Sequence, residues 1–398
     1  MTRQVQDAYI VTALRTPVGK APRGMFRNTR PDDLLAHVLR RVMDSVPAVD
    51  DTDIEDVIIG CAMPEAEQGI NVARVGVLLA GFPDTIPAVT VNRFCSSGVQ
   101  SIAMAADRIR VGDADLIIAG GTESMSMIPM MGHKVATNPA IFNDENIGIA
   151  YGMGITAEKV AERFHISRAA QDAMALRSHQ RALQATRDGK FRDEIAPYEI
   201  THKQPDPTNG EVLVSHIEAT HDECPRPDTS AEGLAKLRPV FRNKGSVTAG
   251  NSSQMSDGAG AVLVASEAAI KRFDLTPMGR FVSFAVAGVA PEVMGIGPIA
   301  AIPKACEKAG ISIADLDWIE LNEAFAAQAQ AVINELELDP EKVNPLGGAI
   351  ALGHALGATG AVRTATALHG IRRDQSKYAM VTMCIGTGMG AAGIYERV

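Results

Sequence analysis

Apolar, β-branched runs alternate with stretches of helical periodicity along the chain. The strand-like runs are bounded by turn residues and begin at Asp7, Asp56, Asp113, Gly260, Arg280, Asp317 and Tyr378. Between them, the spacing of apolar positions predicts helices over residues 31–43, 96–112 and 300–310. Strands that alternate with helices favour an α/β architecture.

The two ends of the chain repeat one order of polar and apolar residues. DIEDVIIG from Asp53 matches DLDWIELN from Asp315, and DADLIIAGG from Asp113 pairs with KYAMVTMCIG from Lys377 at a similar offset. This likeness predicts an internal duplication with halves near residues 1–120 and 275–398. A chance likeness between two α/β segments is the alternative.

The middle of the chain departs from this pattern. It is Met-rich, then helical, and then polar and Pro-rich around THKQPDPTNG and CPRPDTS. We interpret it as an inserted helical and irregular region, of the kind that commonly carries binding surfaces. The predicted division is an N-terminal half of residues 1–122 and 248–272, a loop domain of residues 123–247, and a C-terminal half of residues 273–398.

Composition narrows the class of protein. The 398 residues are 46% apolar and 21% charged, which excludes disorder. The net charge of −9 argues against nucleic acid or an anionic membrane surface as the main partner. The longest uncharged stretch, residues 343–362, carries Asn344, Pro345 and several glycines, so we expect buried loop and helix and no membrane insertion.

The cysteines and the N-terminal residues indicate the cellular compartment of the protein. The five cysteines are scattered without a C-x-x-C pair, which argues against a disulfide framework and a structural zinc site. The N-terminal residues move directly into a strand-like run and lack the pattern of a signal peptide. We therefore expect reduced thiols, no metal, and a cytoplasmic protein.

Cys95 is the first candidate for chemistry. In PAVTVNRFCSSGVQSI it lies where a strand-like segment ends and an amphipathic helix begins. Backbone N–H groups and the helix dipole at that position favour the nucleophilic thiolate, and the small neighbours Ser96, Ser97 and Gly98 leave room for a carbonyl substrate. The alternative is a buried structural cysteine.

Cys384 ends another strand-like run and precedes the Gly-rich IGTGMGAAG. Such a backbone can turn N–H groups toward a developing oxyanion. Residues 388–393 also spell G-x-G-x-x-G, but only five residues follow. A dinucleotide site needs a helix and a second strand after this motif, so we reject that interpretation.

Two further side chains suit proton transfer or oxyanion binding. His354 lies beside glycines in a nearly uncharged segment where a helix is predicted to begin, which suits a general base, although a lone histidine is usually an ordinary core or surface residue. Asn322, in LNEAFAAQ, could orient a water or an oxyanion, or simply cap a turn or a helix. The window from Cys224 to Lys244 is locally basic around Arg226, which suits a phosphate or merely a solvated charged surface.

Together, these segments resemble the thiolase family, and the resemblance runs the full length of the chain. The matching segments, in order, are NRFCSSGVQSI, GGTESMS, AGNSSQMSDGA, LNEAFAAQ, NPLGGAIALGHALGATG and MCIGTGMGAAGIYE. The resemblance implies an α/β thiolase fold of two duplicated βαβαβαββ halves. These would form a five-layered α-β-α-β-α core with an inserted loop domain.

The family's roles carry over to matching positions. Cys95 is implied as the acylated nucleophile, His354 as its base and Cys384 as a second acid and base. Asn322 would hold a water that forms an enolate hole with His354, and the N–H groups of Cys95 and Gly386 would bind the thioester oxygen. The implied reaction is CoA-dependent cleavage of a 3-ketoacyl-CoA.

The residues that would contact CoA are implied by weaker matches to the family's motifs. Met153, Ser253 and Phe325 match positions that line the pantetheine, and Arg226 is the candidate contact for a CoA phosphate. CoA and acyl-CoA are implied as substrates, with no permanently bound cofactor. The family also implies a homodimer or homotetramer, and a β-oxidation enzyme as a candidate partner.

Three alternatives remain open. Condensing enzymes of the ketoacyl-synthase type share the fold but pair the nucleophile with two histidines, whereas this chain has Cys384 at the last position. Non-catalytic thiolase-like lipid-binding proteins usually lose part of the catalytic set. Acetoacetyl-CoA-specific biosynthetic enzymes typically carry His where YGMGITAE has Gly152, so the sequence favours the degradative branch of fatty-acid metabolism.

Overall fold

Two halves of one continuous β-sheet carry the fold in a computed structural model that describes residues 5–398. In the first half the strand order is β1-β8-β5-β3-β4, with β1 (Ala8–Arg15), β3 (Asp56–Gly60), β4 (Ala88–Val91), β5 (Leu116–Ser124) and β8 (Ser256–Ser266). In the second half the order is β10-β11-β12-β9, with β9 (Gly279–Gly288), β10 (Trp318–Leu321), β11 (Tyr378–Ile385) and β12 (Met389–Glu396). The short β2 (Gly19–Lys20) pairs with β8. Only Ala8–Ile10 of β1 join the halves, by pairing with β9.

The two halves repeat the same order of elements. The helices α1 (Pro31–Asp44), α2 (Val72–Leu79) and α3 (Ser97–Arg110) have as counterparts α8 (Gly297–Ala309), α9 (Ala326–Glu335) and α11 (Leu356–Arg373). The strand β3 runs parallel to β5, as β10 does to β11, which confirms the matched segments of the sequence. The counterpart of β4 is reduced to a single bridge between Ile319 and Val343.

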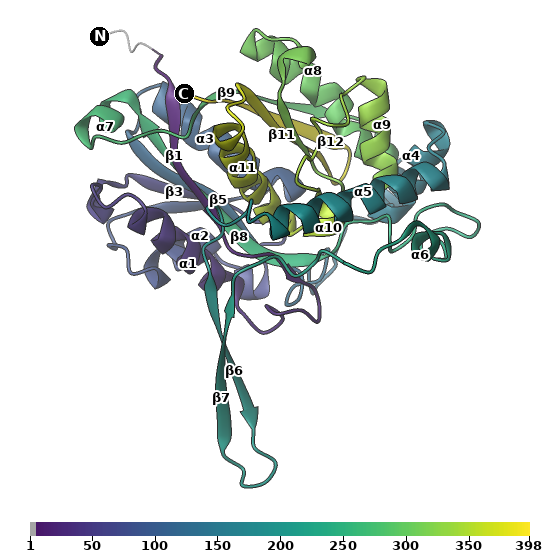
Figure 1. Cartoon of the computed structure of the whole chain (residues 1–398), viewed down its shortest axis with the longest axis horizontal. Coiled ribbons are helices and arrows are strands. Elements are labelled where there is room, and N and C mark those ends of the chain that lie inside the picture. Colours follow the sequence, from purple (N-terminus) through teal and green to yellow (C-terminus); the bar gives the residue numbers. More distant parts are fainter. Residues whose placement is uncertain (1–4) are drawn as a thin grey trace.

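Alternate residues of the strands face different helical layers. Val262 and Val264 of β8 pack with α3 and α11, whereas Leu263 packs with α1 and α2 on the other face. In β11, Val381 packs with α3 and α11, and Met380 packs with α8 and α9. Strands buried on both faces explain the continuous apolar runs. The layers run α-β-α-β-α, from α1 and α2 to α8 and α9 (Figure 1), so the expected fold is confirmed.

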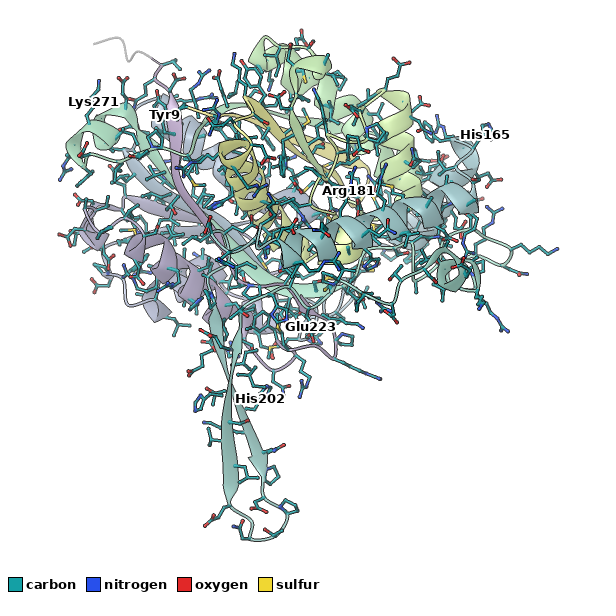
Figure 2. The ribbon with its side chains drawn as sticks, viewed as in Figure 1. Tyr9, His165, Arg181, His202, Glu223 and Lys271 are labelled. Atoms are coloured by element: carbon teal, nitrogen blue, oxygen red, sulfur yellow. The ribbon has the colours of Figure 1, made fainter. Side chains whose placement is uncertain are left out.

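The middle of the chain adds the helices α4 (Met153–Arg163), α5 (Arg168–Arg187) and α6 (Ala231–Ala235). Helix α5 is tied to the second half by Arg181, labelled in Figure 2, whose guanidinium donates to the carbonyl of Val343 at 2.8 Å. The remaining helices are α7 (Glu267–Arg272) and α10 (Ala349–Leu352). The proposed division at residues 122, 247 and 272 stays a prediction.

One segment differs from the expectation of irregular structure. Residues around 201–210 belong to a hairpin in which β6 (Tyr198–Pro205) pairs with β7 (Val212–Ala219). Figure 1 shows the hairpin extending away from the body, and Figure 2 labels His202 on it. Pro205 at the end of β6 and the polar residues at most positions of that strand obscured its pattern, although β7 exposes the apolar Val212, Leu213, Val214 and Ile217.

Residues 343–362, where loop and helix were expected, form α10, the first turns of α11 and the loops beside them. No helix within residues 5–398 is long and apolar enough to cross a membrane.

Candidate active site

Cys95 lies in a constrained turn between β4 and α3. Helix α3 begins at Ser97, as the sequence predicts, but Phe94 before the cysteine adopts a φ of +44°. Such a backbone costs about 1–3 kcal/mol for a residue other than glycine. Two side chains hold it: Asn92 accepts from the N–H of Phe94 at 2.8 Å, and the Ser97 hydroxyl donates to the carbonyl of Phe94 at 2.6 Å.

The thiol of Cys95 is protonated in the resting site. Burial raises the pKa of Cys95 to about 12, although hydrogen bonds from the backbone N–H groups of Gly386 and Cys95 lower it. The negative charge of Glu123 raises it further. The expectation that the helix start favours the thiolate was therefore wrong, because the loss of hydration outweighs the N–H groups. Attack by the sulfur requires a base.

Cys384 and Gly386 come to Cys95 from the end of β11. Cys384 is buried, and its pKa is raised by burial first and then by the charge that Cys95 carries as a thiolate. This electrostatic effect of Cys95 on Cys384 places the two thiols in one site. The N–H of Gly386 points at the Cys95 sulfur.

His354 and Asn322 lie beside each other, and the backbone N–H of Asn322 donates to the carbonyl of Thr382, two residues before Cys384, at 2.9 Å. The Nδ2 atom of Asn322, just after β10, lies 3.4 Å from Nε2 of His354. The other ring nitrogen, Nδ1, lies 2.7 Å from the hydroxyl of Thr359. Burial, helped by the charge of Arg363, lowers the pKa of His354 to about 3. The imidazole is therefore neutral at physiological pH and available as a base.

The loop before β8 holds the His354 segment in place. The backbone N–H of His354 donates to the carbonyl of Gln254 at 2.9 Å and to the hydroxyl of Ser256 at 3.2 Å. Within residues 5–398, Oδ1 of Asn322 is buried without a hydrogen-bond partner. An unpartnered buried oxygen is the feature expected where a water or a ligand binds.

The three residues predicted to line the pantetheine lie near Cys384. Phe325 and Cys384 belong to one apolar cluster, and Met153 packs against it. The N–H of Ser253 donates to the carbonyl of Ala324 at 3.0 Å, beside Phe325. Arg226, the predicted phosphate contact, is exposed, and its backbone N–H donates to Nδ1 of His179 at 3.2 Å.

Two residues of this region were missed by the sequence analysis. Glu123, at the end of β5, accepts from the N–H groups of Ala62 at 2.7 Å and Gly357 at 2.8 Å, so it joins the loop after β3 to the start of α11. Burial raises the pKa of Glu123 to about 7. The sequence feature that could have identified Glu123 is that it is the one charged residue in the segment GGTESMS. Thr359 had none, because the sequence does not show which way a helical hydroxyl points.

The G-x-G-x-x-G segment has no helix after it. Residues 389–396 form β12, which pairs antiparallel with β9 and β11. The rejection of a dinucleotide site at this motif is therefore consistent with the fold. Within residues 5–398, no group of three or more His, Cys, Asp or Glu side chains is arranged to hold a metal ion.

Comparison with known sequence families covers nearly the whole chain. The family described as "Thiolase, N-terminal domain" matches residues 8–268, and "Thiolase, C-terminal domain" matches residues 275–397.

Individual proteins match as fully. A 3-ketoacyl-CoA thiolase of Bacillus subtilis is 50% identical over 393 residues, covering 98% of this chain and 100% of the relative. The peroxisomal 3-ketoacyl-CoA thiolase B of mouse is 45% identical, with 98% and 91% covered. The crystal structure of the Bacillus anthracis acetyl-CoA acetyltransferase superposes with a TM-score of 0.88 at 38% identity and covers 100% of both chains.

Proposed function

This chain belongs to the thiolase family, and from that premise we propose that it is a 3-ketoacyl-CoA thiolase of fatty-acid β-oxidation. It would cleave a 3-ketoacyl-CoA with CoA into acetyl-CoA and a shortened acyl-CoA. The observation that carries the proposal is that Cys95, Cys384 and the N–H of Gly386 lie together and that the Asn322–His354 pair is joined to them. The N–H of Asn322 donates to the carbonyl of Thr382, two residues before Cys384, and Leu356, two residues after His354, packs with Cys95.

The first half-reaction begins with Cys95. Its proton passes to the neutral His354 as the sulfur bonds to C3 of the substrate. The C2–C3 bond then breaks, and its electron pair leaves as the enolate of acetyl-CoA. Cys384 protonates C2 of that enolate, so acetyl-CoA departs and Cys95 keeps the acyl group as a thioester.

The second half-reaction restores both thiols. The Cys384 thiolate takes the proton of incoming CoA, whose sulfur attacks the thioester carbonyl. The Cys95 sulfur leaves and recovers its proton from His354, so that charge and protons balance over the cycle. This order is a ping-pong mechanism.

Two sites would stabilise the negative oxygens. For the enolate, His354 acts with a water held by Asn322, whose unpartnered Oδ1 supports this role. For the thioester oxygen, the N–H groups of Cys95 and Gly386 act together, and both already point at the Cys95 sulfur. Preorganised donors of this kind are worth about 3–4 kcal/mol each in a transition state.

The CoA side uses the apolar cluster near Cys384. We assign Met153, Ser253 and Phe325 to the pantetheine. Arg226 remains our candidate for a CoA phosphate: within the described residues its exposed side chain makes no ion pair, so its charge is available to an anion.

Gly152 supports a substrate range beyond acetoacetyl-CoA. It precedes α4 and Met153, and a Cβ at this position would meet nothing within 4 Å. Open space beside a residue assigned to substrate binding leaves room for a longer acyl chain. The likeness to the Bacillus anthracis acetyl-CoA acetyltransferase favours the acetoacetyl-CoA-specific alternative.

Rates with 3-ketoacyl-CoA thioesters of increasing chain length test the proposal. With CoA present, we expect thiolysis of acetoacetyl-CoA and of longer substrates, and Gly152→His should reduce the rate selectively for the longer ones. Glu267→Gln, a surface substitution in α7, is the control for effects of expression and purification. Strict preference for the four-carbon substrate would favour the biosynthetic alternative, and no CoA-dependent loss of any substrate would indicate a non-catalytic protein.

We also propose a homo-oligomer, a dimer or a tetramer, in the cytoplasm. The strand β4 ends the first half of the sheet and exposes Val89, and an open edge of this kind is suited to pairing with a second copy. The five free cysteines fit a reducing compartment. Light scattering after size-exclusion chromatography would give the oligomeric state.

A further inference from the structure

We propose that Thr359 is a positioning residue that selects the catalytic tautomer of His354. Thr359 lies in the first turn of α11, is 2% exposed, and directs its hydroxyl to Nδ1 of the imidazole at 2.7 Å. The inference rests on the proposed function, because it concerns the base that takes the proton of Cys95.

The contacts of the two ring nitrogens determine the tautomer. A neutral imidazole carries one N–H and one lone pair. The amide nitrogen of Asn322, 3.4 Å from Nε2, can only donate, so Nε2 is the acceptor. The ring hydrogen therefore lies on Nδ1, which donates to the oxygen of Thr359.

Thr359 differs from the other buried threonines of its helix. The hydroxyl of Thr364 donates to the carbonyl of Gly360, four residues earlier, at 2.8 Å and lies 3.1 Å from the hydroxyl of Tyr395. The hydroxyl of Thr366 lies 2.8 Å from Oε1 of Glu194 and 3.3 Å from the carbonyl of Val362. Such back-bonding is the usual habit of a helical threonine. Within residues 5–398, the hydroxyl of Thr359 has the imidazole of His354 as its side-chain partner instead.

This tautomer is the one that the reaction needs. With the hydrogen on Nδ1, the lone pair on Nε2 can receive the proton of Cys95 beside Asn322. Once the imidazolium forms, the Nδ1–H bond to Thr359 persists and stabilises the cation. Without an acceptor, Nδ1–H would be buried and unsatisfied, which favours moving the hydrogen to Nε2 and removes the base.

Three variants separate positioning from packing. Thr359→Val keeps the shape and removes the acceptor, Thr359→Ser keeps the acceptor, and Thr364→Val removes a buried hydroxyl from the same helix. Their kcat and KM for acetoacetyl-CoA thiolysis would be compared. Histidine-labelled protein would give the ¹⁵N shifts of His354, assigned by comparison with His354→Gln.

We expect Nδ1–H in the wild-type protein and a loss of about 10- to 100-fold in kcat for Thr359→Val with KM unchanged, by analogy with the partners that orient metal-bound histidines. Thr359→Ser should keep the tautomer and stay within about threefold, and Thr364→Val should change neither. If Thr359→Val does not fold, the ¹⁵N shifts of His354 in the wild type and in Thr359→Ser still test the predicted Nδ1–H tautomer.

An Nε2–H tautomer in the wild type, or unchanged kcat in a folded Thr359→Val, would overturn the inference. A wild-type protein with the Nδ1–H tautomer but no thiolysis would instead refute the proposed function and leave the tautomer assignment standing.

Discussion

At the scale of single residues, the site combines two groups whose pKa values move apart. Burial raises the pKa of Cys95 to about 12 and lowers that of His354 to about 3. Both shifts favour the neutral thiol and the neutral imidazole over an ion pair. In the proposed reaction, the proton of Cys95 therefore moves to His354 as the sulfur attacks the substrate carbonyl, because the resting cysteine is not a thiolate.

The pH dependence of alkylation tests this neutral pair. Iodoacetamide reacts with the thiolate, so the rate at Cys95 should rise about tenfold per pH unit between pH 7 and 9 without levelling off. The same peptide in urea-unfolded protein should show an inflection near pH 8.5. Mass spectrometry of the Cys95 peptide gives both rates. A plateau below pH 7 in the folded protein would contradict the neutral pair.

Most residues of the candidate site could be predicted from the sequence, but their protonation states could not. Cys95, Cys384, Asn322 and His354 stood out by motif, and the structure places Cys95 beside Cys384 and Asn322 beside His354. The protonation of Cys95 could not be predicted, because desolvation depends on segments far away in the chain.

At the scale of elements, Glu123 links three segments near Cys95: the end of β5, the loop after β3 and the start of α11. Its carboxylate at the end of β5 accepts from the N–H groups of Ala62, Met63 and Gly357. Gly357 lies at the start of α11, directly after Leu356, which packs in the same small cluster as Cys95. The helix that follows His354 is thus tied to the sheet that leads to Cys95.

Glu123→Gln should therefore destabilise the protein. An amide keeps one acceptor and turns donors toward backbone N–H groups, which leaves buried partners unsatisfied at a cost of about 1–3 kcal/mol. Urea unfolding followed by circular dichroism measures this change. The matched control is Glu267→Gln on the surface, where the carboxylate pairs only with Lys271 and little change is expected. Equal urea midpoints for Glu123→Gln and the wild type would show that the carboxylate does not stabilise the contact between these segments.

Elements with a strong apolar pattern were predicted well, and elements without one were missed. The buried strands β5 and β11 read as unbroken apolar runs. Most residues of the hairpin of β6 and β7 are exposed, and the alternation of Tyr198, Ile200 and His202 with exposed neighbours is confined to the first part of β6. Its pairing is set by the backbone ladder and a turn at Gly210, which has a φ of +75°.

At the scale of the whole molecule, duplication builds the site. Each half supplies the end of its parallel strands to one region, with Cys95 after β4 in the first half and Cys384 at the end of β11 in the second. Parallel strands place their carboxyl ends at one edge, which is where ligands bind in open α/β sheets. The matched segments Asp53–Gly60 and Asp315–Asn322 predicted this symmetry, but not that the second half keeps only a bridge at Val343.

The central claim is that Cys95 carries the acyl group between the two half-reactions. The direct measurement is intact-protein and peptide mass spectrometry after brief incubation with acetoacetyl-CoA in the absence of CoA, followed by acid quench. The account predicts one added acetyl mass on the Cys95 peptide, removed when CoA is added before the quench, and none in Cys95→Ala. Acetyl transfer that proceeds at the wild-type rate in Cys95→Ala, or an acetyl group on another cysteine, would contradict it.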